Sequence, residues 1–122
     1  MSKKDDLIFI EHIIDSINAI QDFSKNISKE ELRYNRLNQS AIVREIEIIG
    51  EAVKNISKET KDKYQEVEWR GIAGTRDKMI HHYFGVDIKI VWDIIKKDIP
   101  ILEKQMKKIK EGLISSSSSN KP

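Results

Sequence analysis

Apolar residues recur every three or four positions along most of the chain, which is the pattern of amphipathic helices. A first stripe, in residues 4–22, consists of Leu7, Ile10, Ile14 and Ile17, widened by Ile13 and Ile20. A second stripe begins after Gln39 and consists of Ile42, Ile46, Ile49, Val53 and Ile56. There is no alternating stretch long enough for a substantial strand. The pattern predicts an all-α, up-and-down bundle of four to five helices.

Polar residues mark where these helices begin and bend. Ser28 followed by Glu31 three positions later is a capping-box signature, and residues 35–38 are a plausible bend before the second stripe. Residues 57–68 are polar and charged, which fits a short helix and a connection. Gly50 lies inside the second stripe, where glycine costs roughly 1 kcal/mol against alanine. We therefore expect another helix to pack closely there. For the adjacent Glu51, a solvated or ion-paired carboxylate and a partner of the basic cluster described below both remain open.

A third helix is predicted over residues 69–84, with Gly85 at the left-handed position just past its end. Asp87 can cap the next helix, and Pro100 should kink or restart that helix near Asp98 because proline lacks a backbone N–H. Its apolar positions are Ile88, Val91, Trp92 and Ile95, continued by Ile101, Leu102, Gln105 and Ile109. Residues 1–112 are expected to form one domain. Residues 113–122, which include five consecutive serines, are expected to be a disordered tail.

Composition narrows the possible functions. The 122-residue chain has no cysteine, which excludes zinc-thiolate sites, disulfides and thiol catalysis. No apolar run approaches the ~20 residues needed to cross a membrane, and the charged N-terminus does not look like a signal peptide, so a cytoplasmic protein is expected. The net charge is only +2, so any RNA site must be a local patch. The lysines of residues 104–110 are either a solvated helix face or such a contact.

The groups capable of chemistry gather in one short stretch, which holds Arg76, Asp77, His81, His82 and Tyr83. On a continuous helix, Arg76 and Tyr83 would share a face, and Asp77 would lie one turn from His81 and could fix its tautomer. Such groups suit RNA cleavage, in which the 2′-hydroxyl attacks the phosphate. Histidine can move the protons, and arginine can stabilise the phosphorane charge. One protomer offers only one well-placed imidazole, so a symmetric dimer is expected to complete the site.

The segment W-x2-I-A-G-T-R-D-K-M-I-H-H-Y-F-G-V-D, followed by V-W-D-I-I-K-K-D-I-P-I-L, resembles the HepT-like branch of the HEPN superfamily. The upstream I-I-G-E-A of residues 48–52 is also similar to that family, and the resemblance covers most of residues 5–112. It implies a small all-α protein that dimerises with an R-x4-H-x-Y motif at the dimer cleft. It also implies a ribonuclease toxin of a toxin–antitoxin system, whose partner is a minimal nucleotidyltransferase of the MntA type.

Carried over by position, the resemblance makes Arg76 and His81 the catalytic pair and Tyr83 the residue that accepts AMP from the partner. Asp77 stands where the family often has asparagine, which keeps a polar supporting residue but changes its charge. His82 fills a variable position and ranks below His81. No cofactor or metal is implied. The alternative function is a non-catalytic binding module that docks the nucleotidyltransferase and presents its substrate.

Overall fold

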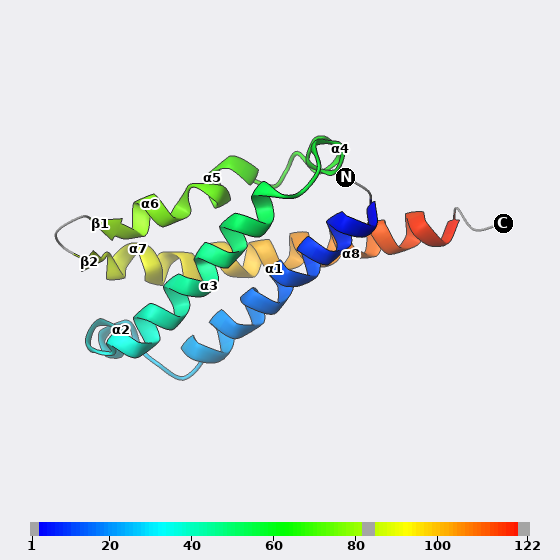
Figure 1. The fold of residues 1–122 in the computed structure, drawn as a ribbon. Helices are drawn as coiled ribbons and strands as arrows, with labels where there is room; N and C mark the ends of the chain where they lie inside the picture. The colour runs from blue at the N-terminus through cyan, green and yellow to red at the C-terminus, as the bar shows by residue number, and fades with distance from the viewer. Residues whose placement is uncertain (1–2, 82–84, 120–122) are drawn as a thin grey trace.

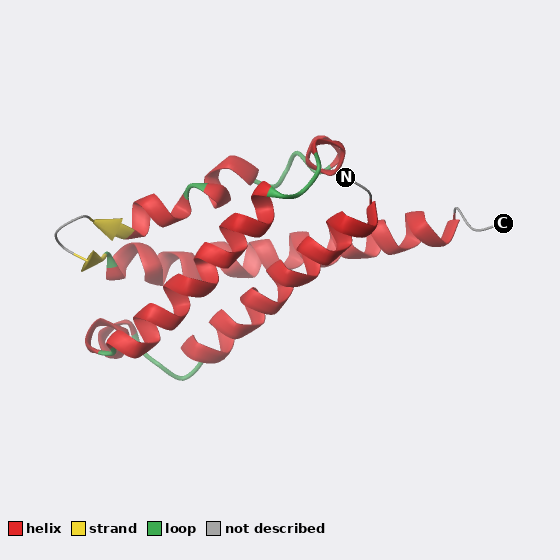
Figure 2. Ribbon diagram, in the orientation of Figure 1, coloured by secondary structure: helices red, strands yellow, loops and turns green. Residues whose placement is uncertain are grey.

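The computed structural model describes residues 3–81 and 85–119 and confirms the all-α class. Three long helical paths dominate the molecule (Figure 1). They are α1 (Lys3–Ser24), α3 (Arg36–Lys54) and the run formed by α7 (Ile88–Asp93), the π-helical turn η1 (Ile94–Asp98) and α8 (Ile99–Ser119). Helix α1 packs against both α3 and α8. Among the described residues, strand is limited to one short hairpin (Figure 2).

The predicted stripes form the core. Ile10, Ile13, Ile17 and Ile20 of α1 are fully buried and face α3. All five apolar residues of the second stripe are buried as well, four of them in α3 and Ile56 just past its end. Leu102 and Ile109 of α8 are also buried, whereas Ile101 is 58% exposed. Burying branched aliphatic side chains stabilises by roughly 1.5–3 kcal/mol each, so these stripes carry most of the favourable energy of folding.

The short helices begin where the polar signals predict. Ser28 and Glu31 form the capping box of α2 (Lys29–Tyr34), and Asn35 separates α2 from α3. Ser57 caps α4 (Lys58–Lys63). Asp6 of α1 is 1% exposed and accepts hydrogen bonds from the Ser57 backbone N–H (2.9 Å) and the Thr60 hydroxyl (2.6 Å). This carboxylate therefore ties α4 to the start of α1.

The continuous helix predicted over residues 69–84 is wrong. Helix α5 (Trp69–Ala73) ends at Gly74, α6 (Thr75–Met79) follows, and the chain then extends into β1 (Ile80–His81). Strand β1 pairs with β2 (Gly85–Val86) in antiparallel register, Ile80 with Val86 and His81 with Gly85. The glycines of this segment favour a break, because glycine is a poor helix former. The Asp87 N–H donates to the Met79 carbonyl at 2.7 Å, which supplies a backbone partner where the helix stops.

The three signals expected to shape the last helices, Gly85, Asp87 and Pro100, all appear in the structure. Gly85 has a φ of 74°, in the left-handed region, although it begins a strand rather than following a helix. Asp87 caps α7 by accepting from the Ile90 N–H at 3.1 Å. The turn η1 widens the helix immediately before Pro100, which accommodates the missing N–H, and α8 restarts at Ile99.

The C-terminal boundary lies beyond the one expected. Helix α8 continues to Ser119, and Leu113 is only 6% exposed. Leu113 follows Met106 and Ile109 at helical spacing, so the buried stripe continues one turn into the stretch expected to be a disordered tail. In the part of the chain that the structure describes, no helix is both long and apolar enough to cross a bilayer.

Candidate functional site

A groove of about 370 Å³ lies between α3 and the α5–α6 segment, and Arg76 is one of its walls. The Arg76 Nε donates to Glu47 Oε2 at 2.7 Å, which joins α6 to α3 across the groove. The Arg76 side chain remains 56% exposed. One edge of the guanidinium is therefore held while much of it still faces solvent. The other polar side chains that line the groove are Arg44, Glu51, Lys54 and Asp77.

The close approach of α5 to α3 at Gly50 sets the position of Arg76. A Cβ atom added at Gly50 would lie 3.5 Å from the Ala73 carbonyl oxygen and 3.6 Å from that of Ile72. This confirms the close packing expected at the mid-helix glycine. Ala73 lies against Gly50. Arg76, three residues after Ala73, reaches Glu47, which is three residues before Gly50 on α3. The two segments therefore run antiparallel, and helical steps on each keep their residues in register.

The apolar side chains of this segment pack inward, and two of its charged side chains face solvent. Met79 is fully buried, and Trp69, Ile72 and Ile80 pack against the core as partly buried residues. Arg76 and Asp77 are exposed. The indole N–H of Trp69 donates to the Tyr64 carbonyl at 3.0 Å, which anchors the start of α5.

The expected adjacency of Asp77 and His81 on one helix is wrong. Asp77 lies in α6, whereas the His81 backbone is extended in β1, so the one-turn spacing does not apply. Likewise, Arg76 and Tyr83 do not belong to one continuous helix, because α6 ends at Met79. His82 and Tyr83 lie outside the described residues, and of His81 only the backbone is described.

Glu47 is the site residue that the sequence did not reveal. Of the two possibilities left open for Glu51, the ion-paired carboxylate is confirmed, because Glu51 binds Lys54 at 3.2 Å and forms no ion pair with Arg76, the arginine of the motif. Glu47 takes the place beside Arg76 instead. Both carboxylates lie on the same exposed face of α3, and only the position of α6 distinguishes them. The sequence signal that could have identified Glu47 is its position one turn before Gly50, the glycine at which another helix was expected to pack.

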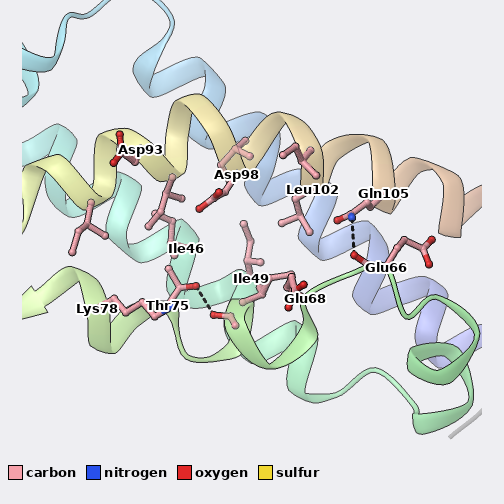
Figure 3. A pocket seen from close by; sticks show the side chains of 16 residues that line it. Ile46, Ile49, Glu66, Glu68, Thr75, Lys78, Asp93, Asp98, Leu102 and Gln105 are labelled. Carbon is pink, nitrogen blue, oxygen red and sulfur yellow. Dashed lines mark hydrogen bonds between the residues drawn. The ribbon is translucent and has the colours of Figure 1, made fainter.

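A larger hollow of about 530 Å³ lies on the other side of the α5–α6 segment, against η1 and α8 (Figure 3). Its floor is apolar and includes Ile46, Ile49 and Leu102. Its polar rim is mainly carboxylate, from Glu66, Glu68, Asp93 and Asp98. Carboxylates repel phosphate, so this hollow is a poor place for a nucleic acid.

Charges elsewhere are largely engaged with one another. Three lysines of the α8 face form ion pairs: Lys107 with Glu103, Lys108 with Glu66, and Lys110 with Glu11. On α4, the hydrogen bond that the Lys58 ammonium donates to the Asp62 carboxylate raises the pKa of Lys58. Over residues 3–81 and 85–119, no three acidic or histidine side chains gather as metal ligands would.

Comparison with known proteins places the chain in one family. The family model described as "Ribonuclease HepT-like" matches residues 13–109. A protein of Caldanaerobacter subterraneus subsp. tengcongensis named "Putative RNase" is 48% identical over 101 residues, covering 83% of this chain and 90% of that protein. The "Probable ribonuclease HepT" of Thermococcus cleftensis is 40% identical over 103 residues, covering 84% of this chain and 94% of that protein.

A "Gamma-glutamylcyclotransferase and putative RNase" of Methanocaldococcus jannaschii is 40% identical over 111 residues. This alignment covers 91% of the chain but only 50% of that longer protein. No solved structure matches the chain. The family model matches most of the helical bundle, and two of the relatives align over nearly their whole length. The chain therefore belongs to the ribonuclease HepT-like family.

Proposed function

We propose that this protein is a HepT-type ribonuclease toxin that cleaves RNA in the cytoplasm without a metal ion. The observation that carries the proposal is membership of the ribonuclease HepT-like family, joined to an R-x4-H-x-Y motif whose arginine lines an open groove. The "RNase" names of the relatives agree with it. RNA is the substrate class because it carries its own nucleophile.

In the proposed reaction, the 2′-oxygen of one ribose attacks the adjacent phosphorus as a base removes its proton. The bond from phosphorus to the 5′-oxygen of the next nucleotide breaks, and an acid protonates that oxygen. The products are a 2′,3′-cyclic phosphate and a 5′-hydroxyl. His81 takes a proton-transfer role because imidazole titrates near neutral pH. Arg76 binds the phosphorane oxygens through its planar fork of donors.

The remaining site residues have supporting or regulatory roles in this proposal. Glu47 holds one edge of the Arg76 guanidinium at 2.7 Å and so limits its orientation. Asp77 contributes a negative charge beside Arg76. Tyr83 accepts AMP from ATP, with pyrophosphate as the leaving group, in a reaction catalysed by a minimal nucleotidyltransferase of the MntA type, which acts as the antitoxin. The added phosphate brings negative charge close to the motif, where it can compete with RNA for an arginine.

The decisive experiment measures RNA cleavage by the purified protein in the presence of a metal chelator. Wild-type protein should release fragments that end in 2′,3′-cyclic phosphate, and His81→Ala and Arg76→Ala should each lower the rate at least about a hundredfold. His12→Ala is the matched control, because this histidine is exposed on α1, outside the groove. Cleavage by His81→Ala at the wild-type rate would remove His81 from the mechanism.

Prior incubation with the nucleotidyltransferase and ATP extends the same assay to Tyr83. Intact mass should rise by one or more AMP units, cleavage should stop, and Tyr83→Phe should remain unmodified. If AMP is added but the unmodified protein never cuts RNA, the alternative holds, and the chain is a binding module that presents its tyrosine to the partner.

A further inference from the structure

Arg44 is a second arginine in the same groove as Arg76. Its side chain is exposed on α3, and it forms no hydrogen bond or ion pair with any residue that the structure describes. The R-x4-H-x-Y motif does not include it, because it lies 32 positions before Arg76. Only the packing of α6 on α3 brings the two arginines to one groove.

The antiparallel register shows on which side of Arg76 this residue lies. Gly50 opposes Ala73, and Glu47 opposes Arg76, so one helical step on α3 toward its N-terminus matches one step on α6 toward its C-terminus. The next step reaches Arg44 on α3 and Met79 on α6. Strand β1, which contains His81, begins directly after Met79. Arg44 is therefore on the side of Arg76 toward which the chain continues to His81.

The surrounding charges leave Arg44 available to an anion. Its neighbour one turn away, Glu47, is already bound to Arg76 at 2.7 Å. Farther along the groove, Lys54 binds Glu51 at 3.2 Å. Residues three apart on a helix have Cβ atoms about 5–6 Å apart, so Arg44 and Arg76 both lie close to the one carboxylate between them. With Arg76 bound to Glu47 and Lys54 bound to Glu51, Arg44 is the basic side chain of the groove that has no ion-pair partner among the described residues, and Asp77, beside Arg76, is the acidic one.

We propose that Arg44 forms a phosphate-binding site for RNA beside the phosphate that Arg76 contacts. This inference rests on the proposed ribonuclease function and adds a substrate contact that the motif does not contain. A single arginine can hold one phosphate but leaves the direction of the strand undefined, whereas two arginines fix two points of the backbone. Arg44 thus places the RNA strand along α3, so that it passes from Arg76 toward β1. The contact is to phosphate, so it should act on every RNA sequence alike.

The test is equilibrium binding of a short 2′-O-methylated single-stranded RNA, which lacks the nucleophile and cannot be cut. Fluorescence anisotropy over a range of salt concentrations gives both the Kd and its salt dependence. Arg44→Ala should raise the Kd about tenfold, because a charge-assisted contact is lost, and should reduce the slope of log Kd against log salt by about 0.7. Arg44→Lys retains the charge and should keep the wild-type slope. Cleavage of unmodified RNA should lose kcat/KM mainly through a higher KM.

Arg33→Ala is the matched control, because Arg33 is an exposed arginine on α2 outside the groove, paired with Glu30. It should leave the Kd and the slope unchanged. A wild-type Kd and slope for Arg44→Ala, in a protein that binds and cleaves RNA, would overturn the phosphate site and leave the proposed function intact. Equal losses in Arg44→Ala and Arg33→Ala would also overturn it, as a general charge effect. Wild-type protein that neither binds nor cuts RNA would overturn both proposals.

Discussion

Arg76 is positioned by a carboxylate that contributes little to folding. The pair with Glu47 is partly exposed, with side-chain exposures of 56% and 28%, and ion pairs of this kind stabilise by only about 0–1 kcal/mol. Its effect is instead on geometry, since an arginine side chain has several rotatable bonds that would otherwise spread its position. A bond at 2.7 Å from one edge of the guanidinium restricts those rotamers while leaving other donors accessible.

Glu47→Gln tests this positioning role. The amide keeps the shape and can still accept a hydrogen bond, but it loses the charge that holds Arg76. We expect kcat for RNA cleavage to fall about tenfold with little change in KM, because misplacement of a charge-stabilising group acts on the transition state. The midpoint of thermal unfolding should change little.

Glu51→Gln is the control for this substitution, because Glu51 lies one turn away on the same face and pairs with Lys54 rather than with Arg76. It should cleave at the wild-type rate. Equal kcat values for Glu47→Gln and the wild type would show that Arg76 needs no partner to be oriented.

At the scale of secondary-structure elements, the groove depends on the contact between α3 and α5. Gly50 is buried, and the backbone of Ile72 and Ala73 passes over it. The distances to a Cβ built at Gly50 are all 3.5 Å or more, which is ordinary van der Waals contact. The site therefore has room for a methyl group but not for a longer side chain.

Two substitutions at Gly50 test whether the contact accepts a methyl group but not a longer side chain. Gly50→Ala should raise the free energy of unfolding by about 0.5–1 kcal/mol, because alanine is the better residue within a helix. Gly50→Leu should lower the free energy of unfolding by about 1–3 kcal/mol through overpacking. It should also reduce cleavage, because the leucine would push α5–α6 away from α3 and so move Arg76 away from Glu47. Denaturant unfolding and the cleavage assay measure both effects. Equal destabilisation by alanine and leucine would contradict the space seen at this contact.

The predicted and observed elements differ most where packing competes with local preference. The stripes of α1 and α3, the cap at Ser28 and the cap at Asp87 all follow from neighbours within four residues, so the sequence predicts them well. The break at Gly74 and the hairpin after Met79 were missed. The pairing of Ile80 with Val86 involves residues six apart, and the helical spacing of Arg76, Asp77 and His81 gave no sign of it.

At the scale of the whole molecule, the proposed reaction needs more proton-transfer groups than the motif of one protomer supplies. Two arginines line the groove, and the R-x4-H-x-Y motif supplies one histidine at the catalytic position, His81, whereas the proposed reaction needs both a base and an acid. A symmetric dimer that joins two grooves would supply the second imidazole. We therefore expect a dimer in solution, with both His81 residues serving one cleft.

Heterodimers that contain one wild-type and one His81→Ala protomer test this arrangement. They can be isolated after co-expression with two different affinity tags. A shared cleft should lose more than about tenfold in rate, since acid and base each contribute at least that factor. Independent sites would instead retain about half of the wild-type rate. The corresponding heterodimer with His12→Ala should be fully active, and light scattering that shows only monomers would exclude the shared cleft.

The sequence by itself determined the helical class, the buried faces, most helix starts and the family motif. These depend on local spacing and on residue types, which the sequence states directly. Only the tertiary structure decided that Glu47 rather than Glu51 meets Arg76, that Arg44 shares its groove, and that Asp77 and His81 are not neighbours on one helix. The physical reason is that α3 and α6 meet through Glu47 and Arg76, which are 29 positions apart in the sequence, and that their register is set by backbone packing at Gly50.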